Sequence, residues 1–384
     1  MELYVHIPFC AKKCSYCSFT SYTGQETFFQ TYIDLLTQEA HLRKDEVSEA
    51  IDTVYIGGGT PSLLPPAILS KLIGNLQSVY DLSNAVEITV EANPGTVTNE
   101  WLKTAAASGI NRISFGMQAF QNRLLKLLGR IHLFEDVVES VSMAREAGIN
   151  NISLDLIFGI PTQTEEEWEK TISETLILKP EHISAYGLIP EEGTPIKRDL
   201  DNGILELPDP EEEREMYNTL IRLLSEYGYH QYEISNFSLP GYECRHNIGY
   251  WTLVPYIGLG VSAASLTDIK YSPEGMSYIR RLCPETLKDY EKMINGNTIS
   301  LLTQEKISPA ESRFETMMLG LRMTQGVSES FFLEKHRLPI EHCYGTKLYA
   351  LEKQGLIKHE KGVWKLTPHG FDIQNSVLVE LMDD

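Results

Sequence analysis

The strongest constraint on the fold of this chain is an alternation of short apolar runs with longer amphipathic stretches over its first 235 residues. Six runs rich in β-branched and apolar residues predict strands, at residues 3–7, 53–56, 86–91, 112–115, 152–157 and 182–186. Helical patterns lie between them, near residues 27–47, 66–79, 99–107, 133–147 and 165–178. Strands separated by helices predict parallel βα units, and six such units predict an α/β fold with an open or partial (β/α)6 barrel.

Two helix starts carry capping chemistry that supports these limits. Thr164 followed by Glu167 fits a capping box, and Asp209 followed by Pro210 fits an N-cap with proline in the first helical position.

The alternation stops near residue 236. A segment rich in glycine, proline and aromatic residues follows at 236–304, and a helical region then leads to a compact tail. A turn at Lys361–Gly362 between two short apolar runs predicts a hairpin, and helix, strand, turn and strand are typical of a winged-helix-like module. We therefore expect a core at 1–235, an extension at 236–304 and a smaller α+β domain at 305–384.

The charge of the chain limits its partners. A formal net charge of −20 predicts no nucleic-acid partner, because phosphate contacts need basic patches. No apolar run approaches the roughly 18 residues of a membrane span, and His6, Pro8 and Lys12 interrupt the layout of a signal peptide. We expect a cytoplasmic protein. Peripheral membrane association stays open, because a local basic patch could still bind an anionic surface.

Three of the six cysteines, Cys10, Cys14 and Cys17, crowd into eight residues directly after the first predicted strand. This clustering predicts metal binding rather than disulfides. Thiolates are the ligands that iron–sulfur clusters select, and three of them leave one iron of a [4Fe–4S] cubane open. Zinc would prefer four ligands in tighter pairs. The loop resembles that of the radical SAM superfamily, in which S-adenosylmethionine binds the open iron and an aromatic residue, here Tyr16, precedes the last cysteine.

Further candidate residues follow the predicted strands, where barrel-type folds bind their ligands. A Gly57–Pro61 run, Gly-Gly-Gly-Thr-Pro, follows the second strand, and glycines let a backbone approach a ligand closely. Carboxylates suit ribose hydroxyls and a sulfonium charge, and a guanidinium suits a carboxylate. Surface or capping roles stay open for each, but least for Asp155, because a buried, unpaired carboxylate is costly. The residues are Glu91 after the third strand, Gln118 and Arg130 after the fourth, and Asp155 on the fifth.

These motifs resemble the family of oxygen-independent coproporphyrinogen III oxidase and its relatives. Tyr-Val-His-Ile-Pro-Phe-Cys at 4–10, the 57–61 run and the polar residues after the strands match the family pattern in order and spacing. In the oxidase some of these positions serve a second cofactor molecule. The resemblance implies S-adenosylmethionine contacts at Tyr4, Tyr16, Gly58, Gly59, Thr60, Glu91, Gln118, Arg130 and Asp155.

Two departures distinguish this chain from the oxidase itself. Phe19 stands where the oxidase has a fourth cysteine, and with the first strand beginning at Leu3 we expect no extension like the one that precedes the oxidase motif. A downstream motif, His246-Asn-Ile-Gly-Tyr-Trp251, is similar to the His-Asn-x-x-Tyr-Trp signature of HemW-type heme chaperones. The resemblance associates this motif with heme.

Imidazole is a common axial ligand of heme iron, so His246 is a candidate heme ligand. Tyr250 and Trp251 could pack on a porphyrin face, and Asn247 could orient the imidazole. The other interpretation of His246, a hydrogen-bonded residue within a packed loop, stays open. Cys244 is interpreted as a buried spare thiol rather than a heme ligand.

Two functions follow. In the first, the chain is a heme chaperone that binds heme, a [4Fe–4S] cluster and S-adenosylmethionine and transfers heme to acceptor hemoproteins, with an electron donor serving the cluster. In the second, it is a radical SAM enzyme acting on a tetrapyrrole, as an oxidoreductase or a methyltransferase. Phe19, the expected lack of an extension and the 246–251 motif favour the first. Whether the chain forms a homodimer stays open.

Overall fold

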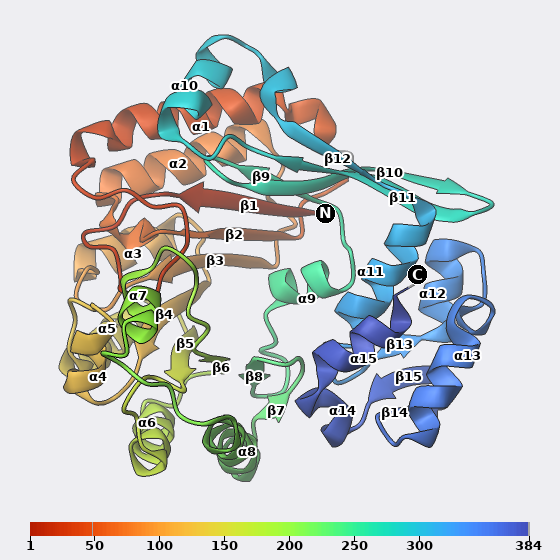
Figure 1. The fold of residues 1–384 in the computed structure, drawn as a ribbon. Coiled ribbons are helices and arrows are strands. Elements are labelled where there is room, and N and C mark those ends of the chain that lie inside the picture. The colour runs from red at the N-terminus through yellow and green to blue at the C-terminus, as the bar shows by residue number, and fades with distance from the viewer. Residues whose placement is uncertain (48, 383–384) are drawn as a thin grey trace.

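A computed structural model describes residues 1–47 and 49–382. Its first half consists of parallel strands joined by helices, as the alternation predicts (Figure 1). Each of the six strands pairs in parallel with the next, and their limits lie within a few residues of the predicted ones. They are β1 (Glu2–Ile7), β2 (Thr53–Gly58), β3 (Glu87–Ala92), β4 (Arg112–Gln118), β5 (Asn151–Phe158) and β6 (His182–Gly187).

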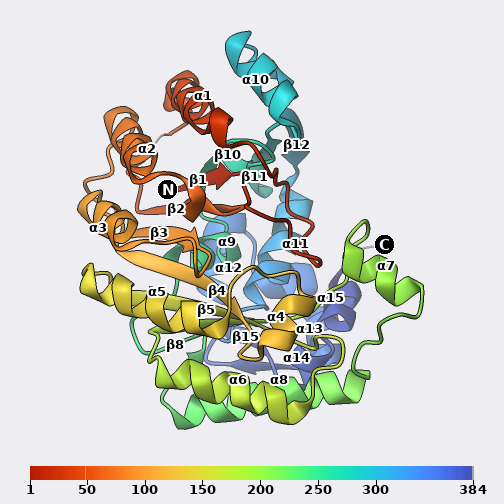
Figure 2. The same ribbon diagram turned by 90° about the vertical axis from the view of Figure 1, so that its left-hand side faces the viewer.

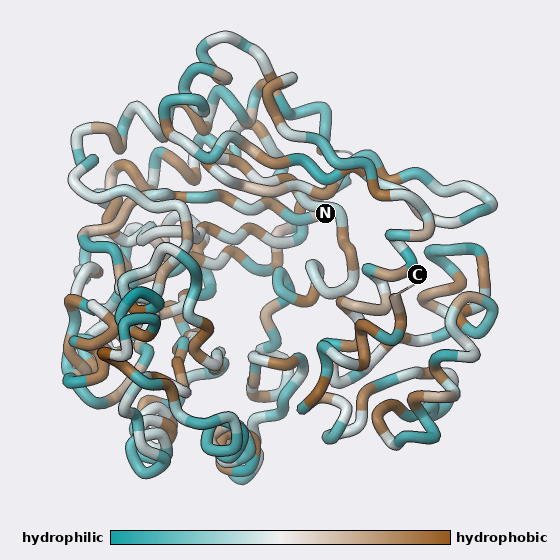
Figure 3. Tube along the Cα trace, viewed as in Figure 1, coloured by the Kyte–Doolittle hydropathy of each residue, from teal (hydrophilic) through white to brown (hydrophobic). Residues whose placement is uncertain are grey.

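The helices between these strands cover the convex outer face of the curved sheet, and Figure 2 looks onto the carboxyl ends of the strands. The predicted caps at Thr164 and Asp209 are confirmed, each as a capping box. The outward sides of α6 and α8 are hydrophilic, whereas the strands are largely hydrophobic (Figure 3). These helices are α1 (Phe29–Leu42), α2 (Pro66–Val79), α3 (Asn99–Ala107), α4 (Asn122–Leu127), α5 (Phe134–Glu146) and α6 (Glu165–Ile177), with short 3-10 turns at Glu26–Phe28, Lys44–Glu46 and Pro61–Leu63. Two more helices, α7 (Pro195–Asp201) and α8 (Pro210–Glu226), follow β6.

The sheet continues on both sides of these six strands, which the sequence pattern does not predict. Among the described residues it has twelve strands, in the order β12-β11-β10-β9-β1-β2-β3-β4-β5-β6-β8-β7. β9 is parallel to β1, whereas β10, β11 and β12 continue as an antiparallel ribbon. The added strands are β7 (His230–Gln231), β8 (Asn236–Ser238), β9 (Tyr256–Leu259), β10 (Ala264–Ser272), β11 (Gly275–Leu282) and β12 (Thr303–Ile307).

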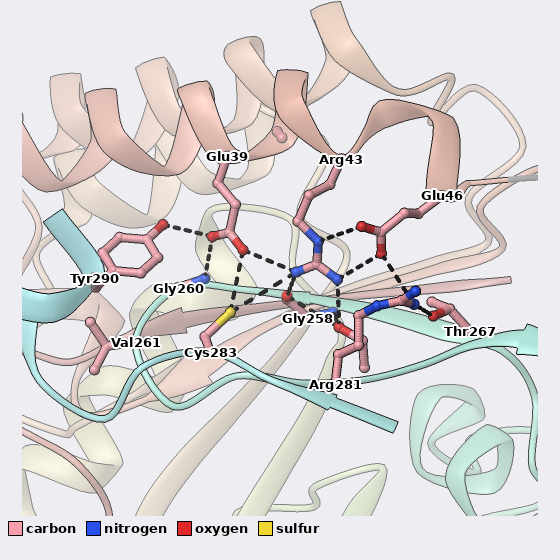
Figure 4. Close-up of polar contacts among 12 residues, drawn as sticks. Glu39, Arg43, Glu46, Gly258, Gly260, Val261, Thr267, Arg281, Cys283 and Tyr290 are labelled. Atoms are coloured by element: carbon pink, nitrogen blue, oxygen red, sulfur yellow. Dashed lines mark hydrogen bonds and ion pairs between the residues drawn. The ribbon is translucent and has the colours of Figure 1, made fainter. Parts of the chain in front are cut away.

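A buried ionic network fastens this extension to α1 (Figure 4). Glu39 and Arg43 form an ion pair of 3.0 Å in which both side chains are fully buried. Arg43 Nη1 also donates to the Gly258 carbonyl at 2.8 Å, and Glu39 Oε2 accepts from the Gly260 amide at 2.8 Å and from the Tyr290 hydroxyl at 2.6 Å. Every charge in this network therefore has a partner from the chain itself. Tyr290 lies on α10 (Leu287–Asn295).

The C-terminal part packs against the open side of the sheet (Figure 1). Its three-stranded sheet has the order β13-β15-β14, and the β14–β15 hairpin turns at Lys361 and Gly362, both with positive φ, as predicted. Residues 383–384 of the expected 305–384 domain lie outside the described residues. The elements here are α11 (Pro309–Gly320), β13 (Val327–Ser328), α12 (Glu329–His336), α13 (Ile340–Lys353), β14 (Ile357–Glu360), β15 (Val363–Leu366), α14 (Pro368–Asp372) and α15 (Gln374–Leu381). The extension before them also contains α9 (Arg245–Trp251) and, after α10, a 3-10 turn at Ile299–Leu301.

None of the described helices combines the length and the apolar character needed to cross a lipid bilayer.

Candidate functional site

A cavity of about 420 Å³ opens at the carboxyl ends of the parallel strands. All of the site residues predicted from the sequence line it except Tyr4 and His246. The residues that the structure brings together are Cys10, Cys14, Tyr16, Cys17, Gly58, Gly59, Thr60, Glu91, Gln118, Arg130 and Asp155.

The cysteine loop is held by backbone hydrogen bonds to three segments. The Cys10 amide donates to Tyr22 O at 2.9 Å, the Ser15 amide donates to Leu128 O at 3.0 Å, and the Ile196 amide donates to Ser15 O at 3.0 Å. All three cysteines are partly exposed. Within the described ranges no three His, Cys, Asp or Glu side chains form a single-ion site. The ligands of a cubane bind different irons and need not meet at one point.

Arg130 lies behind the cysteines, with most of its guanidinium already paired. Its Nη1 is 3.4 Å from Cys14 Sγ, and its Nη2 donates to Gly116 O at 2.9 Å and to Asn93 Oδ1 at 2.5 Å. Its Nε is buried and has no partner. A fixed positive charge beside a cysteine favours the thiolate that a cluster requires.

The Gly58–Gly59 pair is demanded by the chain's own packing. Gly58 has φ +108°, and a Cβ there would lie 2.5 Å from the His6 ring. A Cβ on Gly59 would lie 2.7 Å from Phe9 O. The glycines therefore let β2 approach the base of the cysteine loop, where Thr60 Oγ1 also donates to Cys10 Sγ at 3.5 Å.

Two half-buried carboxylates face the cavity. Glu91 accepts from the Tyr55 hydroxyl at 2.9 Å and from the Gly58 amide at 3.0 Å, and Asp155 accepts from Ser114 at 2.9 Å. Neither has an ion-pair partner in the described part of the chain. Burial, and then the nearby Asp155 carboxylate, raise the pKa of Glu91 from 4.5 to about 7. Burial likewise raises the pKa of Asp155. Both groups would be stabilised by a cationic ligand, and S-adenosylmethionine carries a sulfonium and an ammonium.

Gln118 ends β4 with φ +66°, at a register shift between β4 and β5. This irregular backbone turns a buried polar side chain toward the cavity. A left-handed conformation in a residue other than glycine costs free energy and is often found at ligand sites.

Tyr4 lies outside this cavity and lines a neighbouring one of about 550 Å³. Its hydroxyl is 2.9 Å from His6 Nδ1, and His6 Nε2 is 3.0 Å from Thr20 O. Because a carbonyl can only accept, His6 Nε2 carries the proton and Nδ1 accepts from Tyr4. In this structure, therefore, Tyr4 acts on the cysteine loop through His6.

His246 is fully buried, and both of its ring nitrogens are occupied. Nδ1 is 2.8 Å from Thr53 Oγ1, and Nε2 is 2.9 Å from the Tyr250 hydroxyl. The ring stacks on Tyr55 at 5.2 Å between centroids. Burial lowers the pKa of His246 to about 3, so that the ring is neutral. In this arrangement neither nitrogen is free to bind iron.

The neighbours of His246 behave differently. Asn247 lines the cysteine cavity and an adjacent one, whereas Tyr250 and Trp251 line that adjacent cavity. Cys244 is fully buried with its Sγ 3.4 Å from Glu87 Oε1, and burial raises the pKa of its thiol. It is a buried thiol, as the sequence suggests. Phe19 is 66% exposed at the cavity mouth.

Several cavity residues were not singled out from the sequence. A usable signal existed, because successive inward positions of a strand are two residues apart. Arg112, Ser114 and Gly116 on β4 follow this spacing, as do Ser184 and Tyr186 on β6. The additional lining residues include Asn93, Arg112, Ser114, Gly116, Ser184 and Tyr186.

Comparison with known proteins identifies the family. Residues 4–175 match the radical SAM superfamily, and residues 307–373 match the HemN C-terminal domain. Over 99% of its length the chain is 37% identical to heme chaperone HemW of Lactococcus lactis, and it covers 97% of that protein. It is 36% identical to heme chaperone HemW of Bacillus subtilis, covering 97% of both chains. The chain belongs to the HemW family of radical SAM proteins.

A solved structure confirms the fold of this HemW family member. Coproporphyrinogen III oxidase (HemN) from Escherichia coli superposes with a TM-score of 0.83 over 99% of this chain and 89% of the oxidase, at 23% identity. The α/β barrel and the additional C-terminal domain expected from the sequence are thus present.

Membership of the radical SAM superfamily implies a [4Fe–4S] cluster and S-adenosylmethionine for this chain. The residues present fit both groups. Three cysteines border one cavity with a guanidinium behind them, and the same cavity has two half-buried carboxylates that form no ion pair among the described residues.

Proposed function

We propose that this chain is a heme chaperone that binds heme and transfers it to acceptor hemoproteins. The observation that carries the proposal is the match over nearly the whole chain to proteins named heme chaperone HemW, at 37% and 36% identity. The match includes the 246–251 motif, which resembles the heme-associated signature of that family.

In this proposal Cys10, Cys14 and Cys17 hold the cluster, and its fourth iron is left for S-adenosylmethionine. Glu91 and Asp155 contribute negative charge toward that cofactor, and the glycine run, Thr60, Gln118 and Arg130 complete its surroundings. Their convergence on one cavity supports the assignment. Tyr4 contributes by positioning the loop through His6.

The 246–251 motif serves heme in this proposal. Since both ring nitrogens of His246 are hydrogen-bonded, a direct bond from His246 to iron requires a movement that breaks one of these hydrogen bonds. Without such a movement His246 supports heme binding by orienting the Tyr250 hydroxyl.

The remaining parts of the proposal concern partners. The chain acts in the cytoplasm, receives electrons for its cluster from a donor protein, and meets acceptors among hemoproteins. During transfer of heme to an acceptor, the chain could associate with a membrane surface or act as a homodimer, and both arrangements are to be tested.

An enzyme acting on a tetrapyrrole is the second candidate. The complete cofactor cavity favours it, because a carrier has no evident use for radical chemistry. On that account reductive cleavage of S-adenosylmethionine gives a 5′-deoxyadenosyl radical, which oxidises the ring or leads to its methylation.

One anaerobic experiment separates the two. Protein with a reconstituted cluster is given ferric heme and, in a parallel sample, coproporphyrinogen III with S-adenosylmethionine and reductant. We expect stoichiometric heme retention through gel filtration, weakened in His246→Ala, and no conversion of the porphyrinogen. Absence of heme retention together with porphyrinogen turnover and 5′-deoxyadenosine formation would overturn the chaperone.

A further inference from the structure

A second cavity, of about 790 Å³, lies between the edge of the sheet and the C-terminal part of the chain. Its walls come from β5, β6, α8, α9 and α14, and from the residues that follow α11. It shares Tyr186, Gly187, Ile189 and Asn247 with the cofactor cavity, so the two are adjacent. It is the larger of the two.

Much of this lining is aromatic or aliphatic. Flat apolar walls with a few polar groups are typical of sites for large ring-shaped ligands. The residues of this kind are Phe158, Ala185, Tyr186, Ile189, Pro210, Tyr217, Ile234, Tyr250, Trp251 and Phe371.

Two hydrogen-bond donors on one wall have no partner among the residues that the structure describes. The Nε1 atom of Trp251 and the Nε atom of Arg322 are both buried without an acceptor. The Arg322 guanidinium lies over the Trp251 ring, 5.3 Å from its centroid. No ion pair of Arg322 is found among residues 1–47 and 49–382. Buried donors without partners are costly, and an anionic group of a ligand would satisfy both.

Acidic residues also border this cavity, and they limit where an anion can lie. Glu233 accepts from the Ser235 amide at 3.2 Å and from Asn236, but its Oε2 has no partner. Burial raises the pKa of Glu213. It also raises the pKa of Glu233, against the opposing effects of its hydrogen bonds and of the nearby Arg322 charge, so the neutral forms are favoured. The Trp251–Arg322 wall is therefore where a carboxylate fits best.

The neighbouring cavities are less suitable for a dianionic ring. The cofactor cavity is assigned to the cluster and S-adenosylmethionine, and its Arg130 guanidinium already bonds Asn93 and Gly116. In the cavity beside Tyr4, the cation is Arg280, which already pairs with Glu305 and Glu315 at 2.9 and 2.8 Å.

We propose that heme lies in this inter-domain cavity, with one propionate on Trp251 Nε1 and the Arg322 guanidinium and with the macrocycle against the aromatic walls. The inference rests on the proposed function and gives it a location. Heme in this position contacts the barrel edge, the 246–251 motif and the C-terminal domain together, next to the cofactor cavity.

The test measures the affinity of the full-length, cluster-reconstituted protein for ferric heme and for its dimethyl ester, in which both propionates are blocked. We expect Arg322→Gln to lower the affinity for heme by roughly tenfold or more and Trp251→Phe, which keeps an aromatic ring, by about threefold to tenfold. Neither change should weaken binding of the ester to that extent. The matched control is Arg337→Gln, because Arg337 also lies over an aromatic ring, Tyr271, but outside this cavity.

The outcomes are distinct. Loss of heme affinity in both cavity variants, with the ester and the control unaffected, supports the site. Wild-type-like heme binding in folded Arg322→Gln and Trp251→Phe overturns the site while leaving the proposed function intact. A wild-type protein that retains no heme overturns both. Circular dichroism verifies folding, and the conservative Trp251→Phe keeps the test decisive if Arg322→Gln does not fold.

Discussion

Two regions of this molecule arrange their charged side chains in opposite ways. Under α1, Glu39 and Arg43 pair with each other and with surrounding backbone and hydroxyl groups (Figure 4). At the carboxyl ends of the strands, Glu91 and Asp155 are half-buried beside a cavity. Their hydrogen bonds come from neutral donors, and the Arg112 charge lies nearby. The first arrangement is complete without a ligand, whereas the second leaves two carboxylates beside a cavity with no direct ion pair among the described residues. We infer that the Glu39–Arg43 network stabilises the fold, whereas the Glu91 and Asp155 carboxylates are placed to bind a cationic ligand.

Breaking the closed network should have the largest effect on stability. Arg43→Met leaves the Glu39 carboxylate buried without its ion pair, and we expect a loss of about 3–5 kcal/mol in the free energy of unfolding, measured in urea. Arg123→Met is the control, because its pair with Glu167 is partly exposed and should cost less than about 1 kcal/mol. Equal costs for the two variants would contradict the contrast between the regions. Replacing Glu39 and Arg43 together by Leu and Met should restore most of the loss.

The open site should instead make stability depend on pH. Glu91 has a folded-state pKa raised from 4.5 to about 7, so the native state binds the extra proton between these values. The stability contributed by protonated Glu91 is complete below about pH 4.5 and is lost as pH rises through about 7. The loss is on the order of 3 kcal/mol for the cofactor-free protein.

Unfolding of wild type and Glu91→Gln measured from pH 5 to pH 8 checks this expectation. The wild type should lose stability relative to the variant as pH rises. Parallel curves would show that Glu91 ionises without penalty and that its surroundings already compensate it.

A third variant affects binding more than folding. Asp155→Asn removes a negative charge that has no direct ion pair, so we expect little change in stability but roughly 10- to 100-fold weaker binding of S-adenosylmethionine, which corresponds to about 1.5–3 kcal/mol. Equilibrium dialysis with the reconstituted protein measures it, with the exposed Asp81→Asn as the control. Unchanged affinity in Asp155→Asn would remove this residue from the cofactor site.

The parts predicted from sequence are those with local signals. β-branched runs and caps such as Thr164–Glu167 determine the six strands and the helices between them, and the cysteine spacing marks the loop. β9 could not be found in this way, because it is a short strand whose pairing with β1, far away in the sequence, leaves no local signal.

In the candidate site, too, the sequence predicts the residues that have a local signal and misses those that depend on tertiary contacts. A position after a strand places Glu91 and Asp155 at the cavity, but the sequence does not reveal which neighbour a side chain meets. His246 and Tyr4 therefore lie outside the cofactor cavity. His246 is hydrogen-bonded to Tyr250, and Tyr4 is hydrogen-bonded to His6. Arg322 entered no sequence argument, because only the folded chain brings the C-terminal part against Trp251.

The most direct test of the cofactor cavity is the electron paramagnetic resonance spectrum of the reduced cluster with and without S-adenosylmethionine. Three cysteines and one open iron predict a [4Fe–4S]⁺ signal whose g-values shift when the cofactor is added, and loss of that signal in Cys14→Ser but not in Cys343→Ser. A signal that S-adenosylmethionine leaves unchanged, or one that survives Cys14→Ser, would contradict the account.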